Sequence, residues 1–325
     1  MRNESTMIRF ASFSAAFFVL VFAITYYVLL FVQSGESLSF PSFLTQTPNE
    51  IAETPAKIAE PAIKKVEPAA ENTAENIIEP SVESVEANVS VPVEELTPSP
   101  QPSGNYSGYT EPVGKFKKHK FRQGFSRRTY HTYLGKEADA STPHQTVVLL
   151  HGSGRTGVSL LDMWKETADL YDLYLIAPDS YNRNGWSAFT SSRNFFTDLI
   201  DHAGEEALVN KEEVYLFGHS AGGRLATQLA AKQSLPFRAI ATHAGFNDAA
   251  SLGEVEKNFP KKVPISFYLG DQDHIFKVDA AQATANKFAN AGHDVSLYVI
   301  PDHTHWYYSI GPDLNKLIWA DISQK

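Results

Sequence analysis

The 325-residue chain contains no cysteine. This absence excludes disulfide bonds and metal sites built on thiolate ligands. It is compatible with an oxidising compartment, although it does not indicate one.

Aromatic residues are absent between Leu44 and Asn105. Residues 34–113 instead hold 13 glutamates, 3 lysines and 11 of the 18 prolines of the chain. Such a segment buries too little apolar surface to offset its ordering entropy, so residues 34–114 are expected to form a disordered, self-repelling tether. The segment 34–113 carries 3 minus 13, or −10, while the whole chain carries −9. The rest of the chain therefore nets +1, and the acidity belongs to the tether.

Charged residues are absent from residues 11–32, an apolar stretch of 22 positions. As a helix it would measure about 33 Å, enough to cross a hydrocarbon core of about 30 Å. The alternative is a cleaved signal peptide with Arg2 and Arg9 as its basic region, but the apolar stretch is long for one. We therefore expect residues 1–33 to form an uncleaved, single-pass anchor. The next basic residue after Arg9 is Lys57, which places the N-terminus in the cytoplasm and the remaining chain in the periplasm or outside the cell.

A basic segment, residues 115–128, follows the tether and contains seven lysines and arginines without an acidic residue. One interpretation is contact with an anionic envelope polymer, a lipid headgroup or the acidic tether. The other, which we favour, is a solvated basic edge. Nucleic acid is not expected as a partner, because it would lie across the membrane and no recognition motif is present.

Residues 214–223 read Val-Tyr-Leu-Phe-Gly-His-Ser-Ala-Gly-Gly. A β-prone apolar run here meets a helix-prone segment, which places Ser220 on a tight turn from strand to helix. Gly218 and Gly222 allow strand and helix to approach closely where a Cβ would clash. The pattern predicts a nucleophile elbow with Ser220 as the nucleophile, and with the Ala221 amide aimed at an oxyanion.

A second oxyanion donor is expected after the apolar strand 146–150, which leads into His151-Gly152-Ser153-Gly154. A loop leaving the sheet at this point would present the backbone N–H of Ser153 beside that of Ala221.

Two later strand ends supply an acid and a base, which a serine nucleophile requires. The strand 263–269 ends in Gly-Asp-Gln-Asp-His, where Asp273 is preferred over Asp271 as the orienting acid because it lies three residues past the glycine. The strand 295–300 precedes Pro-Asp-His-Thr-His, where His305 is preferred over His303, a candidate loop histidine, as the base. The chain has eleven histidines, but this constellation accounts for His305 and Asp273 without a metal, so neither a metal nor a cofactor is expected.

The order Ser220, Asp273, His305 is that of the α/β-hydrolases. Residues from about 116 to 325 resemble this superfamily, within the esterase branch that includes polyhydroxybutyrate-depolymerase-like and feruloyl-esterase-like proteins. The resemblance rests on the His151 loop, the elbow, Gly270 to Asp273 and Pro301 to His305. Secreted members of that branch often carry cysteine pairs near the site, which this chain lacks.

The alternation of strand and helix patterns over 115–325 predicts an α/β fold, with a mostly parallel sheet covered by helices on both faces. The segment 245–262 is too short for a large cap domain, which predicts an open site. The loop 178–193, with Tyr181, Trp186 and Phe189, is the expected wall of the pocket, and its aromatic residues could equally belong to the core. Trp186 and His219 are assigned to substrate binding.

The expected function is that of a membrane-tethered serine esterase acting on small or polymer-borne esters through an acyl-enzyme. Two alternatives remain open. One is a serine peptidase or amidase on the same fold, and the other is a non-catalytic envelope-binding protein that retains the fold.

Overall fold

The structure is a computed structural model that describes residues 89–104 and 108–325. In this part of the chain one nine-stranded sheet has the order β1-β9-β8-β7-β6-β4-β5-β3-β2. Neighbouring strands pair in parallel from β1 to β5, and the pairs β5–β3 and β3–β2 are antiparallel. The strands are β1 (Glu94–Glu95), β2 (Lys117–Gln123), β3 (Ser126–Leu134), β4 (His144–Leu150), β5 (Tyr174–Pro178), β6 (Val209–His219), β7 (Ile240–His243), β8 (Ile265–Gly270) and β9 (Val295–Ile300).

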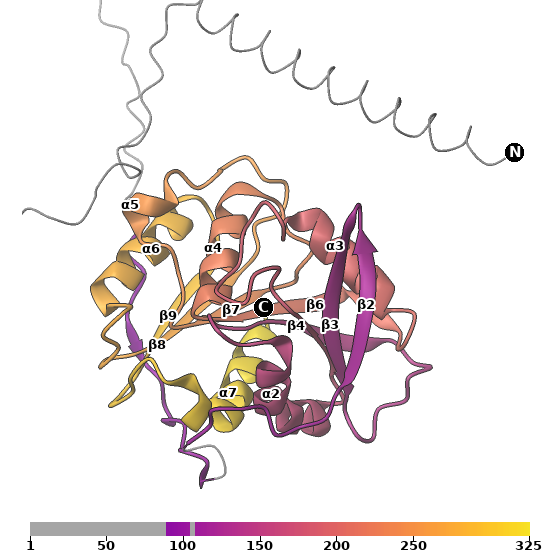
Figure 1. Cartoon of the computed structure of the whole chain (residues 1–325). Coiled ribbons are helices and arrows are strands. Elements are labelled where there is room, and N and C mark those ends of the chain that lie inside the picture. Colours follow the sequence, from indigo (N-terminus) through magenta and orange to yellow (C-terminus); the bar gives the residue numbers. More distant parts are fainter. Residues whose placement is uncertain (1–88, 105–107) are drawn as a thin grey trace, which may run out of the picture. The chain divides into compact units, whose positions relative to one another are not determined.

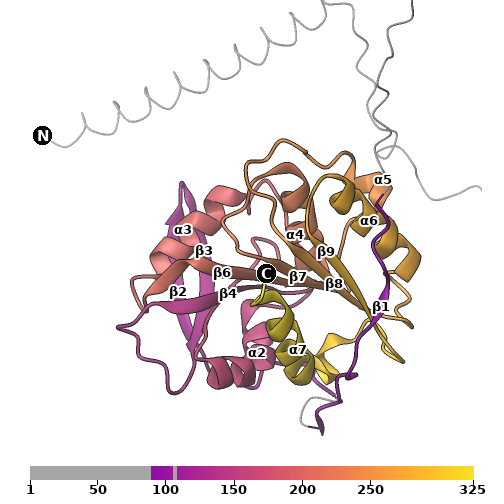
Figure 2. The same ribbon diagram turned by 180° about the vertical axis from the view of Figure 1, so that it is seen from behind.

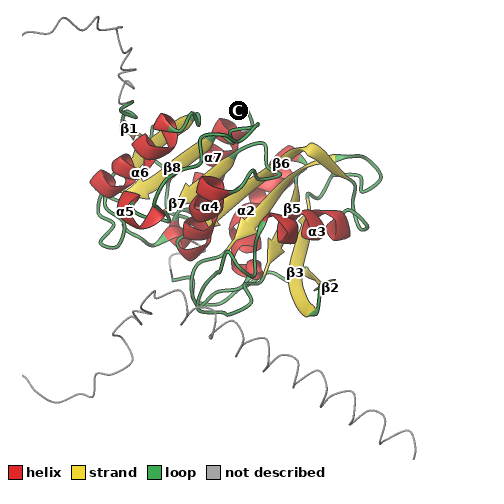
Figure 3. Cartoon of the chain, turned by 90° about the horizontal axis from the view of Figure 1, so that it is seen from above, coloured by secondary structure: helices red, strands yellow, loops and turns green. Residues whose placement is uncertain are grey.

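Helices cover both faces of this sheet (Figure 1). On one face α2 and α7 share an apolar core that includes Trp164 and Ile318, and on the other α3, α4 and α6 share a core that includes Phe196 and Phe288. Figure 3 shows α4 crossing the middle of the second face. The helices are α2 (Gly157–Tyr171), α3 (Arg193–Ala203), α4 (Ala221–Lys232), α5 (Ala249–Leu252), α6 (Val278–Asn290) and α7 (Gly311–Ile322), with a 3-10 turn η3 (Tyr307–Ser309). The predicted architecture of a mostly parallel sheet between helices is confirmed.

The central parallel strands are largely apolar because both of their faces are covered. All of β5, β7 and β8 are buried, as is β4 apart from Gln145. Between β7 and β8 the only helix is the four-residue α5. No cap domain is therefore inserted at this point, and the carboxyl ends of the central strands are covered by loops.

The basic segment forms β2 and the start of β3, at one edge of the sheet. Lysine on an exposed edge strand discourages pairing with another chain. Lys117 contacts Glu206 at 2.7 Å, and Arg128 is the one basic residue of the segment that is buried. Contact with an anionic envelope component stays a prediction.

The predicted boundary at residue 115 differs from the structure. Residues 89–104 and 108–114, here called the strap, pack along the folded domain: β1 pairs with β9 at the sheet edge (Figure 2), and the Ser103 amide donates to the Ser309 carbonyl at 2.8 Å. Val91, Leu96 and Tyr109 are buried. The composition predicted a tether up to residue 114 because these buried apolar side chains are few and widely spaced in the sequence. In the structure, however, each of them packs into a site on the folded domain.

The predicted anchor, residues 1–33, and the tether up to residue 88 lie outside the described residues. Within the ranges that are described, no helix combines the length and apolarity needed to span a bilayer.

Candidate active site

Ser220 lies at the turn between β6 and α4, at the carboxyl end of the central strand. Its φ of 51° and ψ of −113° are strained for a residue with a side chain, a cost that protein sites tolerate where function needs the geometry. The neighbouring glycines are required because a side chain at their positions would clash with the backbone nearby. A Cβ on Gly222 would lie 2.0 Å from the Leu150 carbonyl oxygen, and one on Gly218 would lie 2.6 Å from the Gly222 backbone. The elbow thus has the predicted geometry.

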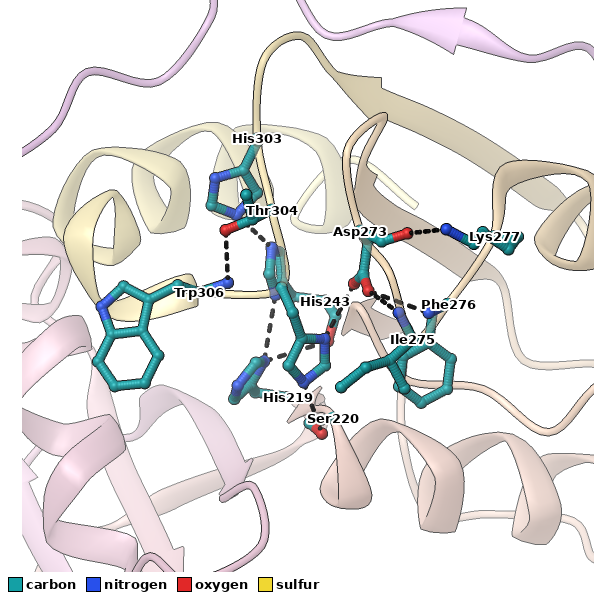
Figure 4. Close-up of polar contacts among 11 residues, drawn as sticks. His219, Ser220, His243, Asp273, Ile275, Phe276, Lys277, His303, Thr304 and Trp306 are labelled. Carbon is teal, nitrogen blue, oxygen red and sulfur yellow. Dashed lines mark hydrogen bonds and ion pairs between the residues drawn. The ribbon is translucent and has the colours of Figure 1, made fainter.

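The side chains of Ser220, His305 and Asp273, which come from the ends of three different strands, lie in contact in this order. His305 Nε2 lies 3.0 Å from Ser220 Oγ, and His305 Nδ1 lies 2.9 Å from Asp273 Oδ2. The second carboxylate oxygen, Oδ1, accepts hydrogen bonds from the amides of Ile275 at 2.7 Å and Phe276 at 3.0 Å (Figure 4). Burial raises the pKa of Asp273, but the hydrogen bonds from His305 and these two amides outweigh it and hold the pKa below its usual value. Asp273 is therefore ionised, oriented and able to fix the imidazole.

The two competing candidates lie elsewhere. Asp271 is exposed, and within the described residues its side chain has no hydrogen bond to a histidine. His303 is buried and turns away from Ser220, so its ring contacts His243. A Cβ on Gly270 would lie 1.8 Å from the His303 carbonyl oxygen, which explains why a glycine precedes the acid loop.

The loop after β4 passes directly beside Ser220. A Cβ on Gly152 would lie 3.5 Å from Ser220 Cβ. In the described part of the chain the Ser153 amide donates to no protein acceptor, whereas the Gly154 amide donates to the Arg183 carbonyl at 2.8 Å. Ala221 is the first residue of α4, where a helix amide has no partner within the helix. The two predicted oxyanion donors, Ser153 and Ala221, therefore lie on the two segments that flank Ser220.

Three buried histidines, here called the histidine chain, lie beside Ser220; their contacts with one another were not predicted. His219 Nδ1 lies 3.1 Å from His243 Nδ1, and His243 Nε2 lies 3.2 Å from His303 Nε2 (Figure 4). Burial, and then repulsion from His305, lower the pKa of His219 to about 3, and burial lowers that of His303 to about 4. Burial also holds the pKa of His243 well below its usual value. All three rings are therefore neutral near pH 7.

In the histidine chain, one backbone carbonyl determines which ring nitrogens donate hydrogen bonds and which accept them. His219 Nδ1 also lies 3.3 Å from the His243 carbonyl oxygen, which can only accept. His219 Nδ1 therefore carries the proton, His243 Nδ1 accepts, and His243 Nε2 donates to His303 Nε2. No periodicity in the sequence points to His243, because its partner is 60 positions away.

The two predicted substrate-binding residues have different surroundings. His219 is 5% exposed, and its ring stacks on Tyr307 with centroids 5.0 Å apart, so it belongs to the floor of the site. The indole N–H of Trp186 donates to the His151 carbonyl at 2.8 Å. Trp186 thus supports the loop after β4, while it also lines a cavity of about 300 Å³ with Tyr181.

Two further aromatic residues at the site were missed by sequence reasoning. Phe276 stacks on His305 with centroids 5.6 Å apart and an interplanar angle of 16°. Trp306, which directly follows His305, is 40% exposed. Both lie in loops whose sequence carries no periodic pattern. Among the described residues, no group of three or more histidine, aspartate or glutamate side chains is arranged so that it could hold a metal ion.

Residues 171–311 match the family model of the phospholipases and carboxylesterases. This stretch contains the elbow, the acid loop and the base loop, on a sheet of the expected topology. The folded domain is a carboxylesterase-like α/β-hydrolase. The predicted resemblance to the esterases of this superfamily is confirmed.

Solved structures agree with this hydrolase fold. A ferulic acid esterase superposes with a TM-score of 0.52 at 17% identity, covering 65% of this chain and 97% of its own. An S-formylglutathione hydrolase from Staphylococcus aureus gives 0.51 at 12% identity, with 64% and 96% covered. A putative dipeptidyl aminopeptidase IV from Bacteroides ovatus gives 0.53 at 14% identity, with 69% of this chain and 37% of that one covered. No curated protein matches the hydrolase in sequence.

Proposed function

We propose that this α/β-hydrolase is a serine esterase with Ser220 as nucleophile, His305 as base and Asp273 as orienting acid. The observation that carries the proposal is the continuous contact from Ser220 Oγ through His305 to the buried Asp273 carboxylate, at 3.0 and 2.9 Å. A serine hydroxyl becomes an effective nucleophile only when such a base receives its proton.

In the proposed reaction, Ser220 Oγ attacks the ester carbonyl carbon while its proton moves to His305 Nε2. The carbonyl π electrons move to oxygen, and the amides of Ser153 and Ala221 stabilise the resulting oxyanion. Collapse re-forms the carbonyl, breaks the bond to the alkoxy oxygen and returns the proton from His305 to the departing alcohol. Water then attacks the acyl-enzyme through the same steps, releasing the acid and regenerating Ser220. Asp273 stabilises the imidazolium throughout.

The test is labelling with a fluorophosphonate probe together with hydrolysis of 4-nitrophenyl butyrate. Ser220→Ala should abolish labelling and turnover, whereas Ser141→Ala, at an exposed turn serine, should change neither. Labelling of Ser220→Ala would show that another residue is the nucleophile. A wild-type protein that is neither labelled nor active would favour the non-catalytic alternative.

The same assay separates an esterase from an amidase. Leaving-group preference depends on pocket contacts rather than on the triad. We expect a higher kcat/KM for 4-nitrophenyl butyrate than for the corresponding 4-nitroanilide, and the opposite ranking would favour the peptidase alternative.

We also propose that the enzyme is tethered to a membrane, with its catalytic domain on the outer side. The support is the uncharged stretch 11–32 and the basic residues before it. The full-length protein should remain with the membrane pellet after osmotic shock and require detergent for release. Release by osmotic shock alone would show that the stretch had been cleaved.

A further inference from the structure

Four arginines surround one cavity of about 390 Å³ beside the loop that follows β4. Arg127 and Arg128 belong to the start of β3, Arg155 to the loop after β4, and Arg183 to the loop after β5. These positions meet because β3 runs antiparallel to β5, which brings the start of one strand to the end of the other. The four residues are here called the arginine pocket.

The arginine pocket holds more positive charge than its own carboxylate balances. Asp179 is the acidic residue that lines it, and this carboxylate already accepts hydrogen bonds from the Gly157 amide at 2.9 Å and from His131 Nε2 at 3.3 Å. Four guanidinium groups against one carboxylate leave a formal excess of +3.

Arg128 makes this excess unusual because it is only 3% exposed. Its guanidinium donates to neutral oxygens of Gln123, Thr190 and Ser191 and stacks on Phe195 at 4.1 Å. A buried cation normally pairs with an anion. Within the described residues no carboxylate contacts it.

The other three arginines are also unpaired with acids in the part of the chain that is described. Arg155 donates to the Thr110 carbonyl and lies over the ring of Tyr308 at 4.8 Å. Arg127 and Arg183 are exposed, and no ion pair within the described ranges involves either side chain. An anion entering the cavity would therefore displace no existing carboxylate.

The arginine pocket lies close to the nucleophile. Arg155 is three residues after Gly152, which approaches Ser220 directly, so the chain between them spans at most about 11 Å. The Gly154 amide holds the Arg183 loop against the loop after β4. An ester bound at Ser220 would thus reach the pocket with a short extension.

We propose that the arginine pocket binds a carboxylate carried by the ester substrate, so that the preferred substrates are esters with a free acid group. The proposal rests on the esterase function proposed above. Guanidinium groups suit a carboxylate because their planar N–H donors match its two oxygens. A cavity of about 390 Å³ also accommodates the chain that bears the acid.

The test compares matched anionic and neutral esters, with the charge placed on either side of the scissile bond. One pair is 4-nitrophenyl hemiglutarate and its methyl ester, and the other is 4-acetoxybenzoate and its methyl ester. For at least one pair, the ratio of kcat/KM for the anionic over the neutral ester should fall about 10-fold in Arg183→Gln and in Arg127→Gln, as expected for loss of a charge-assisted hydrogen bond. Arg122→Gln, at an exposed position of β2 outside the pocket, should leave the ratio unchanged.

The outcomes are distinguishable. If neutral esters are hydrolysed but neither ratio responds to Arg183→Gln or Arg127→Gln, the carboxylate site is wrong while the esterase proposal stands. If Arg122→Gln lowers the ratio as much as the pocket variants, the effect is a general surface charge and the site is also wrong. If no ester is hydrolysed and no fluorophosphonate label is incorporated, the esterase function itself fails.

Discussion

Residues 108–114 of the strap are held by one buried carboxylate, and removing that carboxylate should detach this part of the strap. Asp162 on α2 is fully buried, and it accepts hydrogen bonds from the Tyr109 hydroxyl at 2.7 Å and from the amides of Val113 and Gly114 at 2.8 Å each. Burial and the neighbouring Asp162 raise the pKa of Tyr109, so its hydroxyl remains a donor. Asp162→Ala removes the acceptor for all three donors at once.

The expected loss follows from these contacts. Each hydrogen bond to a charged group contributes about 1.5–3 kcal/mol, and breaking a buried charged network costs about 3–5 kcal/mol. The three losses do not add fully, because a detached strap returns its donors to water. We therefore expect Asp162→Ala to lower the free energy of unfolding by about 3–5 kcal/mol, and Tyr109→Phe, which removes one donor, by about 1.5–3 kcal/mol.

Thermal unfolding measures the loss of stability, and limited proteolysis measures the detachment of the chain segment. A loss of about 3 kcal/mol corresponds to about 6–12 °C in Tm for a domain of this size, and residues 108–114 should become cleavable in Asp162→Ala. The matched control is Asp198→Ala, at an exposed position of α3, which should stay within about 0.5 kcal/mol of the wild type. If Asp162→Ala is no less stable than this control, the carboxylate does not hold residues 108–114.

Three shorter predictions concern the site. Asp273→Asn should lower kcat by about 10⁴-fold and Asp271→Asn by no more than about twofold, in steady-state kinetics on one ester; the reverse ranking would move the role to Asp271. The unfolded chain protonates histidines near pH 6.5, whereas the folded histidine chain resists protonation down to about pH 4 or lower. The free energy of unfolding, measured in urea, should thus fall as pH drops from about 6.5 towards 4, by up to about 1.4 kcal/mol per pH unit for each histidine, and a flat profile would contradict the neutral assignment. Gly222→Ala, whose Cβ would meet the Leu150 carbonyl oxygen at 2.0 Å, should prevent soluble expression, whereas Gly185→Ala, with nothing within 4 Å, should express normally.

The central sheet was predictable because its inner parallel strands contain uninterrupted apolar runs that end in a glycine or a polar turn. The expected strands 263–270 and 295–300 correspond to β8 and β9. The helix-prone segment expected after Ser220 corresponds to α4. Burial on both faces leaves a strong local signal, so the positions of Ser220 and of the acid and base loops followed from the same patterns.

Other features depend on contacts that no local pattern records. β6 begins at Val209 rather than 214, because Lys211, Glu212 and Glu213 lie at a solvated end of the strand where charge is tolerated. The strap was predicted to be part of the tether because its few buried side chains contact residues that are distant in the sequence, as Tyr109 contacts Asp162. No local pattern in the sequence shows such contacts.

The histidine chain also places a condition on the proposed mechanism. His305 becomes a cation when it takes the proton of Ser220, and the ring of His219 lies 5.4 Å from it. A second positive charge at that separation would oppose the imidazolium by about 3 kcal/mol at an effective dielectric constant of about 20, a rate loss of about 100-fold. Burial prevents this, because it lowers the pKa of His219 to about 3. The site can therefore hold four histidines close together only because three of them are kept neutral, which leaves His305 as the one imidazole free to carry the proton.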